Sequence, residues 1–257
     1  MIYEADSNVR KKLMTMFESF DSTIILSCLQ GHMGSAWVDD LENPTVAQIT
    51  VGIFVFYAGN HNALEAKGLL YNLPDFTLAI VRTDEWKKLV ETVHKGSIEK
   101  FQRYSFEKNP NHLDRLHMQN LLSTLPDGYE LKRIDATLVR EPSLHELSED
   151  FFSQFHSIDD YLELGVGFAI VNDGKVVSGA TSFSIYDGGI EIEVATHPNH
   201  TRKGLATVTA SALILECLDR GIYPSWDGAN IESVKLAQKL GYIFKESYDT
   251  YYIENNK

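Results

Sequence analysis

The segment from Glu191 to Thr207 constrains the fold most, because it predicts a strand that runs through a glycine-containing basic turn into a long helix. The first backbone N–H groups of a helix have no acceptor within the helix, and the helix dipole adds about half a positive charge there. Gly204 lets a diphosphate approach the main chain, and Arg202 and Lys203 supply positive charge beside it. We call residues 201–207 the phosphate cradle. The pattern predicts an α/β protein that binds a phosphorylated ligand.

The predicted strand before the cradle carries two carboxylates. Ile190, Ile192 and Val194 alternate with Glu191 and Glu193, so one face packs into a core and the other presents the acidic side chains. Carboxylates this close to a phosphate site are candidates for acid–base chemistry. The alternative is that one or both glutamates simply lie on the solvent face of a strand, where charged residues are common.

The turn and its flanking elements resemble the GNAT superfamily of acyl-CoA N-acyltransferases, whose signature is a strand, a turn Q/R-x-x-G-x-G/A and a helix. Here the turn reads TRKGLA, so Gly204 and Ala206 match, whereas Thr201 replaces the expected Gln or Arg. The rest of the chain is similar to the zwittermicin-resistance branch of that superfamily. The resemblance implies acetyl-CoA as cosubstrate and no metal. It also implies CoA binding by Val194, Thr196, Arg202, Lys203, Gly204, Leu205, Ala206, Thr207 and Asn230.

The same resemblance implies direct transfer of an acetyl group to an amine within a ternary complex. An amine with a pKa of about 10.4 is mostly protonated at neutral pH, so a base is needed, and Glu193 and Glu191 are the candidates. The amide of Val194 is a candidate to hold the carbonyl oxygen as charge develops on it.

The general acid is not where the family pattern places it. Many GNAT enzymes carry a tyrosine seven residues after the asparagine that corresponds to Asn230, and that position is Ala237 here. Tyr242, Tyr223 or Tyr248 would have to substitute, with Tyr242 as the first candidate. Alternatively, the thiolate leaves unassisted.

The acceptor is expected to be a small-molecule amine. Trp226 and Asp227, at the carboxyl end of a predicted central strand, are placed where an amine would approach, although Asp227 before Gly228 is equally a turn former. The net charge of −13 disfavours nucleic acid and anionic membrane as partners and favours a cationic substrate, although acidic proteins are common in the cytosol. A homodimer is compatible with the sequence.

Two domains are predicted, residues 1–126 and 127–257, on either side of the turn Pro126-Asp127-Gly128. The expected order in the second is strand, two helices, three antiparallel strands, helix, strand, helix, strand. This is the GNAT order, an α/β (α+β) arrangement with a mixed, mostly antiparallel sheet flanked by helices. The first domain shows a similar succession, but its turn from Ala58 to Asn62 has no basic residue. We therefore expect an α/β domain that is a degenerate GNAT-like half.

Local patterns make further predictions. Asp84 is expected to cap a helix, and Asp173-Gly174 is typical of a type I′ hairpin turn. The predicted strands include residues 24–29, 46–57, 242–246 and 248–253.

Cys28 and Cys217 lie far apart in apolar surroundings, so we expect buried thiols in a reducing cytoplasm. The polar start of the chain, Met1 to Arg10, does not resemble a signal peptide. The apolar stretch from Val51 to Ala58 is about half of what a membrane span needs.

Other chemistries lack their motifs: the sequence contains no HExxH, G-x-S-x-G or G-x-G-x-x-G. His197 and His200, beside the cradle, are interpreted as exposed loop histidines. Two alternatives to the enzyme stay open. One is a CoA-binding or regulatory protein that has lost turnover, which Thr201 and Ala237 favour. The other is a structural scaffold that binds no CoA.

Overall fold

The computed structural model describes residues 1–254, which form two compact units: residues 1–103 with 247–254, and residues 104–246. The elements of the first half of the chain are β1 (Tyr3–Glu4), α1 (Ser7–Lys12), the 3-10 helix η1 (Glu18–Phe20), α2 (Thr23–Leu29), β2 (Ser35–Val38), β3 (Val46–Val51), β4 (Phe54–Gly59), α3 (Ala66–Tyr71), β5 (Phe76–Ile80), α4 (Asp84–Val93) and β6 (Ile98–Phe106).

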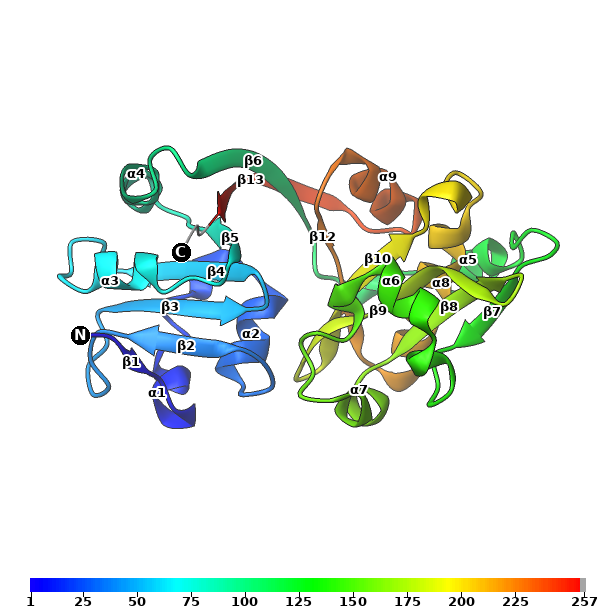
Figure 1. The fold of residues 1–257 in the computed structure, drawn as a ribbon, viewed down its shortest axis with the longest axis horizontal. Coiled ribbons are helices and arrows are strands. Elements are labelled where there is room, and N and C mark those ends of the chain that lie inside the picture. The colour runs from blue at the N-terminus through cyan, green and yellow to red at the C-terminus, as the bar shows by residue number, and fades with distance from the viewer. Residues whose placement is uncertain (255–257) are drawn as a thin grey trace. The chain divides into compact units, whose positions relative to one another are not determined.

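The sheet of the first unit is antiparallel from β1 through β2 and β3 to β4, and β5 then pairs parallel with β4 (Figure 1). Helix α3 makes the connection between the two parallel strands. The core of this unit is formed by buried residues of the sheet and of α3 and α4, among them Leu69, Ala79 and Trp86.

The second half of the chain continues with the elements η2 (Pro110–His112), α5 (Arg115–Leu122), β7 (Glu130–Arg133), η3 (Leu138–Arg140), α6 (Pro142–Leu147), η4 (Glu149–Phe151), α7 (Ile158–Leu164), β8 (Gly167–Asn172), β9 (Lys175–Tyr186), β10 (Gly189–Thr196), η5 (Pro198–His200), α8 (Leu205–Arg220), β11 (Tyr223–Ser225), β12 (Asp227–Gly228), α9 (Ile231–Lys239) and β13 (Phe244–Glu254).

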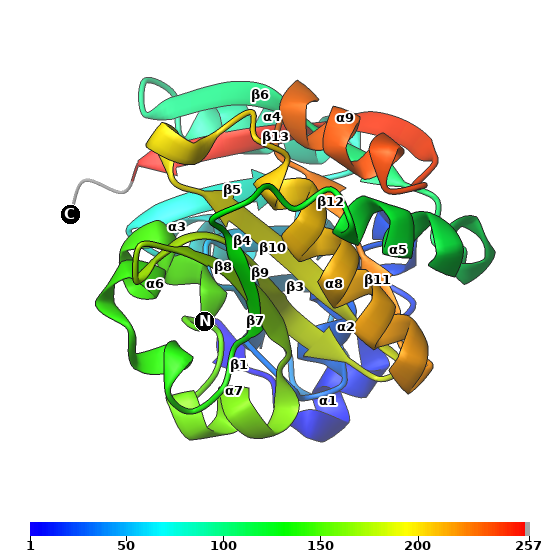
Figure 2. The same cartoon turned by 90° about the vertical axis from the view of Figure 1, so that its right-hand side faces the viewer.

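The five-stranded sheet of the second unit repeats the plan of the first, in the order β11-β10-β9-β8-β7. Strands β7 to β10 are antiparallel, and β11 pairs parallel with β10. Figure 2 shows α8 crossing a face of this sheet with α5 beside it. Helix α8 is buried over most of its surface, and Leu213, Ile214 and Cys217 pack in one core with Ile190 and Tyr242. The repeated order confirms the predicted fold class, including a GNAT-like first half.

The last strand of each half contributes to both units. The end of β6 pairs with β12 through Ser105 opposite Asp227, within the second unit. The end of β13 pairs antiparallel with β5 within the first unit, where Tyr251 and Ile253 are buried. The first unit is therefore completed by the C-terminal strand of the second half.

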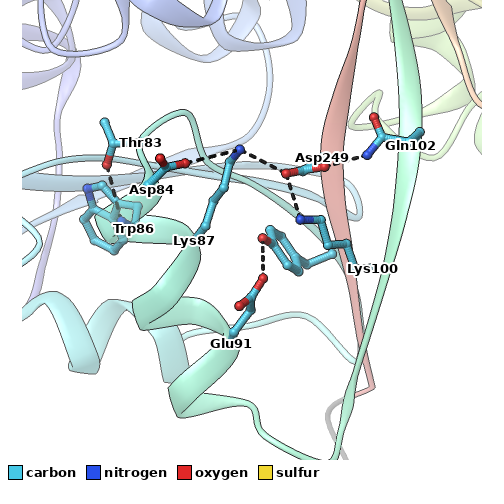
Figure 3. Close-up of polar contacts among 9 residues, drawn as sticks. Thr83, Asp84, Trp86, Lys87, Glu91, Lys100, Gln102 and Asp249 are labelled. Carbon is cyan, nitrogen blue, oxygen red and sulfur yellow. Dashed lines mark hydrogen bonds and ion pairs between the residues drawn. The ribbon is translucent and has the colours of Figure 1, made fainter.

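A cluster of charged residues fastens β13 in the first unit (Figure 3). The carboxylate of Asp249 accepts hydrogen bonds from Lys87 Nζ on α4 and Lys100 Nζ on β6, each at 2.9 Å, and from Gln102 Nε2 on β6. One turn along α4 from Lys87, Glu91 accepts the hydroxyl proton of Tyr251 at 2.8 Å. Polar contacts thus join two elements, α4 and β6, to the final strand.

Side-chain caps start three of the four longest helices. The carboxylate of Asp114 accepts the amide proton of His117 at the start of α5, and the side-chain oxygen of Asn230 accepts the amide proton of Ser233 at the start of α9. For α4 the cap is Thr83, whose hydroxyl accepts the amide of Trp86, so the prediction of Asp84 was wrong by one residue. Helix α8 starts differently, at a glycine and without a side-chain cap.

Two of the strand predictions need correction. Residues 24–29 lie in helix α2, because nearly every side chain of that helix is buried and the sequence shows no one-sided pattern. Residues 46–57 form two strands, β3 and β4, separated by a turn in which Gly52 has a φ of 57°.

Two further local predictions concern the end of the chain and the hairpin turn. The two strands expected over 242–253 are the single strand β13. The hairpin turn between β8 and β9 is confirmed, since Asp173 and Gly174 both have positive φ, 49° and 76°.

The predicted domain boundary after residue 126 lies between α5 and β7, within the second compact unit, and stays a prediction. Cys28 and Cys217 are buried free thiols, and burial raises the pKa of Cys217 to about 12. Among the helices of residues 1–254, none has both the length and the apolar character that a membrane crossing requires.

Candidate active site

The candidate site lies at the carboxyl end of β10. This strand pairs with β9 along its whole length, but its parallel pairing with β11 covers only Gly189 to Glu191. Beyond that point β10 continues through Glu193 to Thr196, and the chain then enters the turn before α8. The end of β10 therefore extends past its parallel neighbour immediately before the cradle.

The structure gives the two glutamates different surroundings. Glu191 is only 5% exposed and lies level with Ser184 on β9 and Ser225 on β11. Glu193 is partly exposed and lies opposite Thr181, on the same face of the strand. Their neighbours Ile190 and Ile192 pack in the core with α8, as the alternation predicts. Of the two carboxylates, Glu193 is the more accessible.

The backbone of the cradle has the geometry of an anion site. Arg202 has a φ of 60° and Gly204 a φ of 81°, so two left-handed residues flank Lys203. Such alternation turns successive N–H groups towards a common concavity. A Cβ atom added at Gly204 would meet no atom within 4 Å, so the space beside this glycine is open. With no side-chain cap at its start, α8 keeps its first N–H groups available to a ligand.

Hydrogen bonds within the preceding loop use other candidate side chains. Thr201 donates its hydroxyl proton to the carbonyl oxygen of Pro198 at 3.1 Å. The Nδ1 atom of His197 accepts the amide of Asn199 at 3.2 Å. The side chain at the first position of the family turn therefore holds the loop itself, whereas Arg202 is exposed.

The other predicted CoA residues lie on β10, within the cradle or at the cap of α9. Thr196 shares a hydrogen bond of 2.8 Å with Ser178 on β9, and Thr207 accepts one of 3.4 Å from Lys239. Leu205 is buried, while Val194 and Ala206 are partly exposed. Asn230 is exposed and caps α9.

Tyr242 is placed poorly for proton donation in this conformation. It is 3% exposed, and its hydroxyl donates to the carbonyl oxygen of Pro224 at 2.5 Å. Burial, reinforced by nearby ionisable groups such as Tyr223, raises the pKa of Tyr242 well above 10. A phenol with a raised pKa is a weaker acid, so its role as the general acid stays an untested prediction.

The two residues predicted to meet the amine differ in exposure. Trp226 is buried, its ring centre lies 5.6 Å from that of Tyr242 in a tilted arrangement, and it donates its indole N–H to Ser233. Asp227 is partly exposed and pairs with Ser105 in the short β12 ladder. Only Asp227 has side-chain surface available, and both substrate roles stay predictions.

One residue near the cradle was missed by the sequence reasoning. The hydroxyl of Tyr129 accepts a hydrogen bond from Lys203 at 2.9 Å. The two residues are 74 positions apart, and no motif connects them, so only the folded chain reveals the contact.

Comparisons with known proteins identify the family. The model of the GNAT acetyltransferase family matches residues 14–251. Over 266 residues, the chain is 27% identical to an uncharacterised N-acetyltransferase of Bacillus subtilis strain 168, YdfB, with 98% of each chain covered.

Solved structures with a similar fold come from the same family. The fold is similar to a GCN5-related N-acetyltransferase-like protein from Streptococcus suis 89/1591, with 35% identity, a TM-score of 0.87 and coverage of 95% of this chain and 98% of that one. It is also similar, at 9% identity and a TM-score of 0.57, to a tandem GNAT protein from the clavulanic acid biosynthesis pathway, with 99% and 98% covered. That second likeness concerns the fold alone. The chain therefore belongs to the GNAT acetyltransferase family, and it is an acetyl-CoA-dependent N-acetyltransferase.

Proposed function

We propose that this enzyme transfers the acetyl group of acetyl-CoA to a primary amine of a small molecule, directly within a ternary complex, with Glu193 as the base. The observation that carries the proposal is the open, uncapped cradle at the end of the strand that bears Glu193. A phosphate site and an accessible carboxylate on one continuous strand-turn-helix segment are what such a transfer needs.

The residues of the cradle fit the diphosphate of CoA. The first-turn amides of α8 and the side chains of Arg202 and Lys203 would hold it, and Gly204 would allow close approach. Val194, Thr196 and Asn230 would contact the remainder of the cosubstrate. Acetyl-CoA supplies an activated acetyl thioester when bound, and the protein supplies orientation and proton transfer.

Glu193 is the better base because it is partly exposed, whereas Glu191 is buried. A base must reach the ammonium of the incoming amine or a water molecule that contacts it. We assign Glu191 the secondary role of shaping the site beneath Glu193. The backbone amide of Val194, next along β10, is the candidate donor to the carbonyl oxygen.

Loss of the thiolate does not depend on the usual tyrosine in this proposal. Ala237 occupies the family position and is fully buried. Tyr242 would have to break its hydrogen bond to Pro224 before it could donate a proton. Departure without a tyrosine acid is therefore the simpler assignment.

The acceptor class follows from charge. The chain carries a net charge of −13, which attracts cationic amines, and Asp227 offers a partly exposed carboxylate on β12, shortly after the end of β11. The resemblance of the sequence to the zwittermicin-resistance branch makes an aminopolyol the first acceptor to test.

The test is release of free thiol from acetyl-CoA across a panel of primary amines, including aminopolyols and diamines, with the corresponding alcohols as controls. Turnover with an amine and intersecting initial-velocity lines support direct transfer in a ternary complex. Parallel lines would contradict direct transfer. Saturable acetyl-CoA binding without turnover on any amine would instead favour a regulatory role.

A further inference from the structure

Tyr129 connects the cradle to the edge of the second unit's sheet. It immediately precedes β7, the edge strand, and its hydroxyl receives a hydrogen bond from Lys203 Nζ at 2.9 Å. The same hydroxyl lies 3.0 Å from Nδ1 of His200. The Lys203 ammonium also lies over the Tyr129 ring, 5.6 Å from its centre, and the His200 ring stands edge-on at 5.8 Å. One side chain therefore contacts the cradle at Lys203 and the loop before it at His200.

The ring of Tyr129 is itself fixed. It packs against a small buried cluster that includes Leu205 and Val208 from the first turn of α8. Its hydroxyl faces the loop while its ring contacts the helix that the loop precedes. Tyr129 thus sets the position of Lys203 relative to the start of α8.

The donor and acceptor groups fix the direction of the two hydrogen bonds that Tyr129 makes. A lysine ammonium has donors only, so the oxygen of Tyr129 must accept from Lys203. The proton of the tyrosine is then available to Nδ1 of neutral His200. Partial burial, Lys203 and His197 each lower the pKa of His200, against an opposing effect of Asp173, so the neutral form that can accept is favoured.

The loop needs support from outside. Arg202 has a left-handed backbone, with a φ of 60°, which is unfavourable for a residue that carries a Cβ atom. The bond from Thr201 to Pro198 lies within the loop and cannot fix it relative to the helix. Tyr129 supplies a contact from a separate element.

We propose that Tyr129 is a positioning residue, which holds Lys203 and the loop in the conformation that receives the diphosphate of CoA. The inference rests on the proposed function of the cradle. Order imposed before binding reduces the entropy lost on binding, so the tyrosine increases affinity for the cosubstrate without touching the reacting atoms.

The experiment measures acetyl-CoA affinity by calorimetry for the wild-type enzyme, Tyr129→Phe, Lys203→Met and the double variant. Tyr129→Phe keeps the ring that packs against the buried cluster and loses only the hydroxyl. We expect its Kd to rise about threefold to tenfold, the effect of one hydrogen bond. In the Lys203→Met background the same change should alter the Kd by less than about twofold, because its partner is gone.

Kinetics separate positioning from general damage. With a reactive amine, Tyr129→Phe should raise the KM for acetyl-CoA by the same factor and leave kcat unchanged. With S-acetylpantetheine, which lacks the diphosphate, the variant and the wild-type enzyme should have equal kcat/KM. Tyr71→Phe, which removes the hydroxyl of a tyrosine that is 66% exposed in the first unit, is the matched control and should change nothing.

Several outcomes overturn the inference: an unchanged or tighter Kd in Tyr129→Phe, an equal effect in the Lys203→Met background, or an equal loss with S-acetylpantetheine. If Tyr129→Phe fails to fold, His200→Ala tests the same chain, since it should weaken acetyl-CoA binding while leaving S-acetylpantetheine turnover unchanged; an unchanged Kd there also overturns it. A wild-type enzyme that does not bind acetyl-CoA would refute the proposed function itself.

Discussion

The two halves of this chain share one strand and helix order but differ at the connection between their parallel strands. In the first half, β4 leads to β5 through α3, a helix of six residues that starts after Glu65. In the second, β10 leads to β11 through α8, a helix of 16 residues that starts at Gly204 behind Arg202 and Lys203. A carboxylate precedes one helix and two cations precede the other. We therefore expect anion binding to depend on this connection and not on the fold that carries it.

The glycines of the two connections show the same contrast. At Gly59 a Cβ atom would lie 2.3 Å from the carbonyl oxygen of Thr45, whereas at Gly204 it would meet nothing within 4 Å. The first glycine permits close packing, and the second leaves room for a ligand. The glycine of the first connection therefore serves packing, and the glycine of the second leaves open space beside the backbone.

The largest effect should come from Gly204→Asp, which adds bulk and negative charge in the cradle. We expect acetyl-CoA affinity to fall by more than about 100-fold, because the carboxylate would occupy the diphosphate position. Calorimetry measures the loss. Ordinary affinity in this variant would mean that the two connections do not differ in the way described.

Glu193→Gln should lower kcat by about 100-fold and leave acetyl-CoA affinity unchanged, since the amide keeps the shape but cannot accept the proton. Steady-state kinetics with calorimetry measure both. Glu99→Gln, at an exposed position on β6, is the control and should retain full activity. A fall in cosubstrate affinity without loss of kcat would remove Glu193 as the base.

Alanine at the two glycines should separate packing from binding. Gly59→Ala should cost about 3 kcal/mol, since its Cβ would overlap the Thr45 oxygen at a φ of 88°. Gly204→Ala should cost about 1 kcal/mol, from its φ of 81° alone. Denaturant unfolding measures the stability of the two variants, and titration with acetyl-CoA measures their affinity. Gly59→Ala should lose stability and keep its affinity for acetyl-CoA. Equal destabilisation would contradict the contrast.

The last prediction concerns Asp249 in the first unit. Burial raises the pKa of this carboxyl, but hydrogen bonds from Lys100, Lys87 and Gln102 outweigh burial and lower it from 3.8 to about 2. Because the folded pKa is the lower one, the stabilisation of about 2 kcal/mol is present above pH 4 and is lost as the pH falls towards 2.

Asp249→Asn should therefore destabilise the first unit at pH 7 and have little effect near pH 2. Hydrogen exchange of the amides in β5 and β13 reports on that unit directly. Asp219→Asn is the matched control, because Asp219 pairs with Arg115 at the surface of the second unit and should contribute less than about 1 kcal/mol. Equal effects of the two variants at pH 7 would show that the cluster does not hold β13.

Local patterns in the sequence predicted most elements of the second half, although the two strands expected over 242–253 are the single strand β13. Helix α8 runs from Leu205 to Arg220 and starts directly after Gly204, which the sequence motif identifies, and both Gly204 and Gly221 have left-handed backbones. The hairpin at Asp173 was equally clear. Helix α2 was mistaken for a strand, because burial on most sides erases the periodicity on which such predictions depend.

The candidate site was predictable in its backbone and less so in its side chains. Gly204 and Arg202 could be chosen from one short motif. The unequal burial of Glu191 and Glu193 could not, because alternation along a strand gives only the face and not what covers it. Tyr129 was invisible for a similar reason, since its contact with Lys203 spans 74 positions.

The sequence alone determined the strand, turn and helix of the cradle, because φ preferences, helix ends and alternation depend on residues a few positions apart. Tertiary structure decided which strand completes the first unit and how deeply Glu191 and Glu193 are buried. It also decided which side chain accepts a hydrogen bond from Lys203. Those features arise from contacts between distant segments, whose free energies become favourable only when the whole core is assembled.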